Sequence, residues 1–285
     1  MPRRAAPSAR SRMLAIVLRE LRRKANLSAS QVARELGMSS TKITRIETCE
    51  IGVYLDDLET LLDFYRVEPK RRAELLDLAR HAEQREWLRL NNPNLPADWQ
   101  TWSDFEDEAS ALCQYQPLVV PGLLQTPEYA AALILATGAG LADAEVDALV
   151  ASRMARQGLL SRREPLRLHA IIEQSVFERS LSDGEVLARQ LRSLADAAGR
   201  PNITIQVLPS SAGLHGGLNG PFIVLDYPGQ SSLIWLENKI SSLIVDDDEQ
   251  VGQYQRTWGE LDKLALGEPE SVEYLNARAG ALAPA

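Results

Sequence analysis

The stretch LSASQVARELGMSSTKITRIE, residues 27–47, predicts two short helices joined by a turn at Gly37. Ser28 and Gln31 have the spacing of a capping box, which opens the first helix. Gly37 suits the left-handed end of that helix, and Ser39 can cap the second. Two helices joined by so short a turn are typical of a helix-turn-helix unit.

The second helix of this unit has a polar and basic outer face. With Ile43 and Ile46 directed to the core, no acidic side chain remains on that face. A helix of this kind fits the major groove of B-DNA, where arginine can bind guanine and serine or threonine can adapt to several bases. Any amphipathic helix has a polar face, but the turn and the basic flanks favour DNA binding. The predicted contacts with double-stranded operator DNA are Ser39, Ser40, Thr41, Lys42, Thr44 and Arg45.

Apolar positions at helical spacing predict that residues 1–90 form an all-α domain of five helices. The predicted helices cover residues 11–25, 28–36, 39–48, 55–65 and 69–90.

The N-terminal part of the chain and the remainder also differ in net charge. The formal net charge is -8, yet residues 1–48 carry 11 Lys and Arg against 3 Asp and Glu, a net of +8. Residues 91–285 carry 13 basic and 26 acidic residues, a net of −13. A basic N-terminal part on an acidic remainder is expected when only the N-terminal part meets a polyanion.

The segment NNPNLPADW, residues 91–99, is rich in proline and asparagine and predicts a linker over 91–103. Beyond it we expect an α+β domain over 104–279, then a flexible tail, 280–285. After Pro165 the hydrophobic period becomes alternating, which predicts a sheet of about five strands, mostly antiparallel where connections are short. The predicted strands cover 165–172, 203–209, 222–227, 232–237 and 240–245. The predicted helices cover 104–111, 126–135, 143–160 and 183–198, with a final long helix that opens at 246–249 and runs to about Leu266.

Several classes of protein are not expected. No apolar run approaches the roughly 20 residues of a membrane-spanning helix, and the basic residues 1–10 lack the apolar stretch of a signal peptide. Cys49 and Cys113 form no CxxC pair and are expected as free buried thiols in the cytoplasm. The spacing of the three histidines predicts no metal site, and no cofactor is expected.

Catalysis is not expected either. The glycine-rich segment GLHGGLNG, residues 213–220, contains His215 but lacks the ending of a phosphate-binding loop, and no nucleophile elbow occurs. Between two strands it is expected to be a mobile loop, with a lid over a pocket as one reading. Acidic residues at strand ends, Glu173, Asp226 and Glu237, leave an enzymatic second domain as the alternative.

LSASQVARELGMSSTKITRIE resembles the Xre-type helix-turn-helix of lambda-repressor-like proteins over about residues 12–66. The resemblance implies that Ser39 caps the recognition helix, that Ser40, Thr41 and Arg45 face base edges, and that Lys42 and Thr44 reach phosphate or base. It also implies a structural pair between Arg22 and Glu47. Two positions depart from the family pattern. The usual glutamine of the second helix is Ala29, and the glycine after the recognition helix is displaced to Gly52.

The remainder of the chain, about residues 98–278, resembles the C-terminal domain of WhiJ-like regulators of actinobacteria, which is described as antitoxin-like or sensor-like. The segments VVPGLLQTPEYAAAL (119–133) and VLPSSAGLHGGLNGPFIVLDY (207–227) carry the likeness. Whether Leu124, Gln125 and Tyr129 line a ligand or partner site with His215, or only hold a turn, stays open at this point.

These observations lead to the hypothesis of a cytoplasmic transcriptional regulator that binds operator DNA as a homodimer. Its C-terminal domain would sense a small-molecule ligand or a small companion protein. The alternative within the binding class is an antitoxin that neutralises its partner and controls its own operon.

Overall fold

The computed structural model describes residues 8–80, 88–91, 102–103, 105–138, 140–179, 181, 183–238 and 241–282. Most of the predicted linker, residues 92–101, lies outside the described residues, as do residues 283–285 of the predicted tail.

Five helices form the N-terminal domain: α1 (Ala9–Lys24), α2 (Ala29–Leu36), α3 (Ser40–Glu47), α4 (Leu55–Phe64) and α5 (Pro69–Arg80). Their apolar faces meet in one cluster, because residues three and four apart share a helix face. Leu14, Val32, Ile43, Leu58 and Leu75 each supply a buried side chain from a different helix. The structure therefore has the all-α domain of five helices that the sequence predicted for this region.

The fifth helix does not reach Leu90 as predicted. The structure describes α5 as far as Arg80, residues 81–87 lie outside the described residues, and residues 88–91 form strand β1 (Leu88–Asn91), which pairs antiparallel with β7 (Ser241–Val245). Without β1, strand β7 would leave its backbone N–H and C=O groups unpaired at the edge of the sheet. At residues 88–91, hydrogen bonding to β7 therefore decides the structure, although the apolar residues before Leu90 have helical spacing.

The second domain contains a mixed sheet of six strands rather than about five. They are β2 (Ala111–Gln116), β3 (Arg167–Glu173), β4 (Ile203–Leu208), β5 (Phe222–Asp226), β6 (Leu233–Glu237) and β7. With β1 at one edge the order is β1-β7-β6-β5-β2-β3-β4. Strands β2, β3 and β4 are parallel, and the other pairs are antiparallel.

Strand β2 is the one that the sequence pattern missed. Residues up to Ala111 were expected to be helical, but β2 begins there and lies in the middle of the sheet. Both faces of a central parallel strand are covered, so its sequence need not alternate between apolar and polar residues. Along β2 the buried residues are Ala111, Leu112, Gln114 and Tyr115, whereas Cys113 and Gln116 are only partly buried, so burial follows no period of two.

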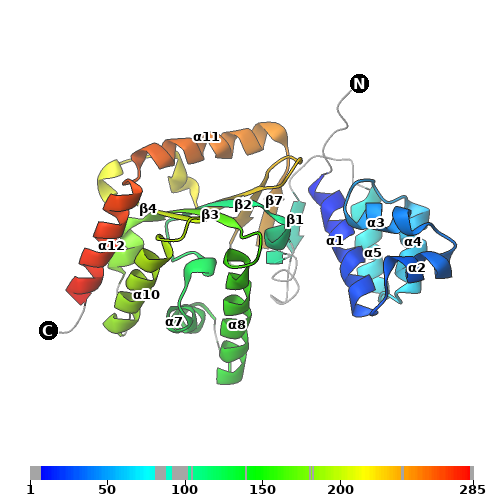
Figure 1. The fold of residues 1–285 in the computed structure, drawn as a ribbon, viewed down its shortest axis with the longest axis horizontal. Coiled ribbons are helices and arrows are strands. Elements are labelled where there is room, and N and C mark those ends of the chain that lie inside the picture. Colours follow the sequence, from blue (N-terminus) through cyan, green and yellow to red (C-terminus); the bar gives the residue numbers. More distant parts are fainter. Residues whose placement is uncertain are drawn as a thin grey trace.

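Helices cover both faces of the sheet (Figure 1). Helix α11 (Asp248–Leu264) lies across one face, and α7 (Pro127–Thr137), α8 (Asp143–Arg156) and α10 (Gly184–Ala197) lie on the other. The parallel pairs require these helices, because a chain that returns to a parallel strand must cross over the sheet. Short elements complete the connections: α9 (Gln174–Glu178) and the 3-10 turns η1 (Gly122–Leu124), η2 (Gln157–Leu160), η3 (Ser210–Ala212) and η4 (Gly216–Asn219).

The sequence predicted that α11 is the final helix, and this prediction is wrong. Residues 268–282 form α12 (Glu268–Leu282), which buries Leu275 and Ala279 against α10 and β4. The predicted flexible tail therefore begins inside a packed helix.

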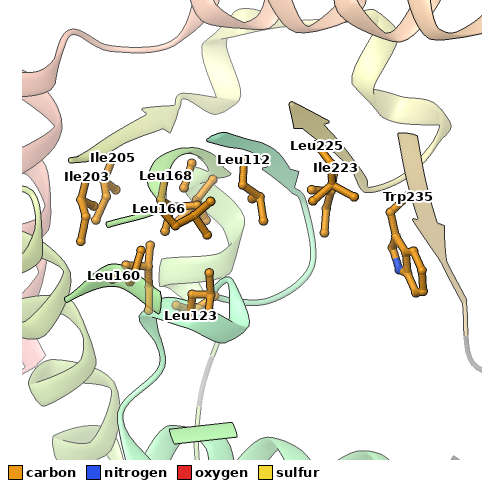
Figure 2. Packing of buried hydrophobic residues seen from close by; sticks show 14 of the residues in the cluster. Leu112, Leu123, Leu160, Leu166, Leu168, Ile203, Ile205, Ile223, Leu225 and Trp235 are labelled. Carbon is orange, nitrogen blue, oxygen red and sulfur yellow. The ribbon is translucent and has the colours of Figure 1, made fainter. Parts of the chain in front are cut away.

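The main core of the C-terminal domain lies between the sheet and α7, α8 and α10. Figure 2 shows Leu112, Leu168 and Ile205 side by side on neighbouring strands, with Leu123 and Leu160 beneath them. A second cluster, which includes Ile171 and Val224, lies on the opposite face under α11. Within the described residues, no helix combines the length and the apolar character that crossing a membrane demands.

Candidate nucleic-acid interface and residues of the C-terminal domain

The turn between α2 and α3 is held by local caps. The Ser28 side chain accepts a hydrogen bond from the Gln31 backbone, and the Gln31 side chain accepts one from the Ser28 N–H at 2.8 Å. Gly37 ends α2 with a φ of 66°, a left-handed conformation that glycine adopts without cost. The Ser39 hydroxyl accepts from the Lys42 N–H at 3.1 Å and so begins α3. These caps fix the angle at which α3 leaves α2.

Helix α3 exposes the hydroxyl-bearing face that the sequence predicted. Ile43 and Ile46 are buried, while Ser40, Thr41 and Thr44 are exposed. The Thr44 hydroxyl donates to the Ser40 carbonyl at 3.0 Å, within the helix, and it retains its acceptor capacity. The exposed groups can therefore donate to or accept from the edges of bases in a major groove.

The two cationic side chains of α3 both contact carboxylates. Lys42 Nζ lies 2.8 Å from Asp57 Oδ1 on α4, and Arg45 Nε lies 3.4 Å from Glu50 Oε2. Arg45 remains 42% exposed, so its ion pair is a surface contact of small free energy. Nucleic acid at this face would have to replace both carboxylates, and sequence reasoning identified neither Asp57 nor Glu50.

The structure brings Arg22 and Glu47 together in a largely buried, bidentate ion pair. Arg22 donates from Nε to Glu47 Oε1 at 2.8 Å and from Nη2 to Oε2 at 2.7 Å. A third donor, Nη1, binds the Leu27 carbonyl at 2.9 Å. Because Glu47 accepts these bonds, the pKa of Arg22 is raised. The pair joins the end of α1 to the end of α3, and the third bond ties both to Leu27, which precedes the N-cap of α2.

Ala29, at the position where the Xre-type pattern has glutamine, is half-buried and packs against the N-terminal core. Its methyl group cannot hydrogen-bond to a base or a phosphate. At Gly52, the displaced glycine, an added Cβ would meet no atom within 4 Å.

In the C-terminal domain, Leu124, Gln125 and Tyr129 hold a turn. The buried Gln125 donates to the Val120 carbonyl at 2.7 Å and accepts from Arg153 at 2.8 Å. The Tyr129 hydroxyl accepts from the Val120 N–H at 3.3 Å, and burial raises the pKa of Tyr129. These bonds favour the structural reading of the three residues over a pocket lining.

Gln190 on α10 completes this turn and was not singled out from the sequence. Fully buried, it donates to the Leu124 carbonyl and accepts from the Thr126 N–H, both at 2.7 Å. Gln190 could have been identified from the sequence because it lies on the apolar face of an amphipathic helix. A buried amide there requires hydrogen-bond partners.

His215 lies away from that turn, on the other side of the sheet. Its Nε2 lies 3.2 Å from Glu173 Oε1, which also accepts a hydrogen bond from the Tyr115 hydroxyl at 2.7 Å. Burial and the Glu173 carboxylate raise the pKa of Tyr115. Gly217 packs on the Tyr115 ring, where an added Cβ would lie 2.7 Å from Cζ.

His215 and Gly217 seat the glycine-rich loop, residues 213–220, on the domain. Leu214 and Leu218 of the same loop are exposed, Leu214 by 93%. Within the described residues, no group of three or more His, Cys, Asp or Glu side chains could hold a metal ion.

Two regions of the chain match models of known protein families. Residues 13–75 match the family model of a helix-turn-helix domain, and residues 99–277 match the model of a domain of unknown function, DUF5753. No curated protein sequence matched the chain.

Among solved structures, the chain is similar to TrmBL2, an archaeal chromatin protein whose structure shows a novel mode of DNA binding. The likeness has 14% identity and a TM-score of 0.31, and it covers 76% of this chain and 72% of that chain. That TM-score is too low to establish a common fold.

Proposed function

The chain belongs to the DUF5753 family, and we propose that this member is a sequence-specific DNA-binding transcriptional regulator. In this proposal the helix-turn-helix domain reads the operator, and the C-terminal domain receives a signal from a small molecule or a companion protein. We assign no catalytic role to either domain.

The exposed face of α3 is the observation that carries the proposal. Ser40, Thr41, Thr44 and Arg45 lie on one face of a helix whose N-terminus is capped and solvent-exposed. Such an N-terminus attracts phosphate, while the side chains beside it can reach base edges. Figure 1 shows α1 facing the C-terminal domain, with α2 and α4 beyond it, so the acidic domain does not cover this part of the molecule.

Selection of bound sequences from random duplex DNA tests the proposal. The wild-type protein should enrich one motif, and Arg45→Ala should lose about 1–3 kcal/mol of binding free energy and relax the preference at one base position. Arg71→Ala is the matched control, since Arg71 is a similarly exposed arginine on α5. Absence of enrichment, or the same motif and affinity with Arg45→Ala, would contradict the proposal.

We also propose a homodimer, because helix-turn-helix proteins usually bind two half-sites about one helical turn apart. The selected motif should then be palindromic, and light scattering should give twice the chain mass of 31.5 kDa. A monomeric mass with a single half-site would overturn this part of the proposal.

A further inference from the structure

Helix α1 belongs to two hydrophobic cores at once. Leu14 and Leu18 pack in the core of the N-terminal domain, whereas Ala9, Met13 and Ile16 pack in the core of the C-terminal domain. The two sets lie on different faces of one helix. The first two turns of α1 therefore cannot move relative to the C-terminal domain without moving the whole helix-turn-helix domain.

Three polar contacts, called the latch below, add to this apolar contact. The Ala9 N–H, in the first turn of α1, donates to Asp246 Oδ2 at 2.6 Å. Arg12 donates from Nη2 to the Ser231 carbonyl at 2.8 Å, and its guanidinium lies 4.5 Å from the centre of the Tyr227 ring. Asp246 also places a negative charge at the helix N-terminus, where the helix dipole favours it.

The latch is tight but energetically costly. Arg12 is only 2% exposed, and its Nε and Nη1 have no hydrogen-bond partner among the described residues. Desolvation lowers the pKa of Arg12, although Tyr227 and nearby acids act in the opposite direction. A buried cation that is incompletely hydrogen-bonded offsets much of the gain from the apolar contact. The contact between α1 and the C-terminal domain is therefore weaker than the burial alone implies.

Helix α11 connects to both sides of the latch. Asp246 directly precedes Asp247, the N-cap of α11, and Gln255 on α11 donates to the Ser232 hydroxyl at 3.3 Å, next to Ser231. Further along, Thr257 lies against Gly216 of the glycine-rich loop, where an added Cβ would lie 3.0 Å from it. One helix thus spans from the glycine-rich loop to the residues that hold α1.

Helix α11 has few fully buried residues for its length. Of its 17 residues only Val251 and Leu261 are buried, while Tyr254 and Trp258 pack partly buried against the core beneath the helix. It also contains Gly252 and Gly259, and an added Cβ at Gly259 would meet no atom within 4 Å. Glycine inside a helix lowers its stability, and at Gly259 no steric contact requires it.

We propose that α11 and the latch form a coupling that sets the orientation of the helix-turn-helix domain on the C-terminal domain. A ligand or partner that displaces α11 would move Asp246 and the Ser231 carbonyl together, and α1 would follow or be released. This inference deepens the proposed function, on which its DNA-binding consequence rests, by naming the elements that carry the signal.

Hydrogen exchange of the full-length chain tests the coupling without DNA. Arg12→Met keeps the aliphatic bulk of the side chain and removes its charge and its hydrogen bond. It should accelerate exchange in α1 and in the first turn of α11 by roughly tenfold, because the Ser231 carbonyl loses its donor and Tyr227 loses the guanidinium, and we expect these losses to exceed the desolvation cost that the variant relieves. Arg23→Met is the matched control, on an exposed position of the same helix, and should leave both segments unchanged.

A second variant acts from the other end. Gly259→Ala should stiffen α11 and slow exchange in α1, which it does not touch. Asp246→Asn, which removes the charge at the N-terminus of α1, should accelerate exchange in α1 even if Arg12→Met fails to fold. Exchange in α1 that is the same in Gly259→Ala, Asp246→Asn and wild type would overturn the coupling.

Binding to operators with varied half-site spacing separates this inference from the proposed function. The wild-type protein should select one spacing, and Arg12→Met should accept several while it binds a single half-site with unchanged affinity. Equal spacing selectivity in both proteins would overturn the coupling while DNA binding stands. Failure of both to bind any duplex, with the exchange results as expected, would overturn the proposed function alone.

Discussion

Asp57 on α4 holds Lys42 of α3 in an ion pair of 2.8 Å. Asp57 is mostly buried, whereas Lys42 is partly exposed, so the carboxylate fixes the position of the ammonium group rather than the reverse. The pair both joins two helices and withholds a cation from the face that would meet DNA.

Asp57→Asn should therefore strengthen DNA binding. Removal of the carboxylate frees Lys42 for a phosphate, and the slope of log affinity against log salt should become steeper by about 0.9. Fluorescence anisotropy over a series of salt concentrations measures both quantities. Asp63→Asn, an exposed carboxylate on the same helix that pairs with Arg72, serves as the control. Equal affinities and slopes for the two variants would show that Lys42 reaches no phosphate.

Loss of Arg22 should destabilise the N-terminal domain. Arg22→Met leaves the buried carboxylate of Glu47 without its partner and should lower the free energy of unfolding by about 3 kcal/mol. The double variant Arg22→Met with Glu47→Leu should recover part of the loss, because no charge then stays buried. Urea unfolding measures each variant. Lys24→Met, which breaks only an exposed pair with Glu20, should change stability by less than about 0.5 kcal/mol.

Gly217 should not tolerate a side chain. Its Cβ would lie 2.7 Å from the ring of Tyr115, which is fully buried and bonded to Glu173. Gly217→Ala should therefore cost about 1–3 kcal/mol through overpacking and displace the glycine-rich loop. Gly158→Ala, where an added Cβ meets no atom within 4 Å, should be close to neutral. A melting temperature equal to that of wild type in Gly217→Ala would show that the loop is not seated on Tyr115.

Alkaline pH should destabilise the protein. Burial raises the pKa of Cys49 from 9.0 to about 11 and that of Cys113 from 9.0 to about 12. Above the unfolded value the unfolded chain loses these protons while the folded chain keeps them. This contribution to stability is therefore fully present below about pH 9 and is lost as the pH rises toward the folded values.

Urea titrations at pH 8 and at about pH 10 check this expectation, because the free energy of unfolding should fall between them. Replacement of both thiols by alanine should make the fall smaller. A wild-type protein with equal stability at the two pH values would contradict the partial burial of the thiols.

The local signals in the sequence were sufficient for the helix-turn-helix region. Ser28, Gly37 and Ser39 act through bonds that span three or four residues, so a short stretch contains all the information they need. The strands near residues 167–173, 203–208 and 222–226 were also found, because the hydrophobic period changes to alternation after Pro165 and turn residues bound each segment.

What the sequence could not give depends on distant partners. β1 forms because β7 offers an edge, and β2 lies in the sheet because strands on both sides pair with it. Likewise, no pattern near Lys42 in the sequence predicts its ion pair with Asp57, and none near Arg12 predicts its hydrogen bond to Ser231. Contacts between residues far apart in the chain have no local pattern.

The double membership of α1 has a consequence for dissection of the molecule. An N-terminal fragment that ends within residues 91–103 would expose Ala9, Met13 and Ile16 to solvent as an apolar surface. The C-terminal domain that remains would lack β1 at the edge of its sheet. Such an N-terminal fragment is expected to self-associate even though it contains every helix of its own fold. A chimera that exchanges helix-turn-helix domains between relatives should instead keep the recipient's residues at those three α1 positions. The boundary between the two domains lies along one face of α1 and not in the linker.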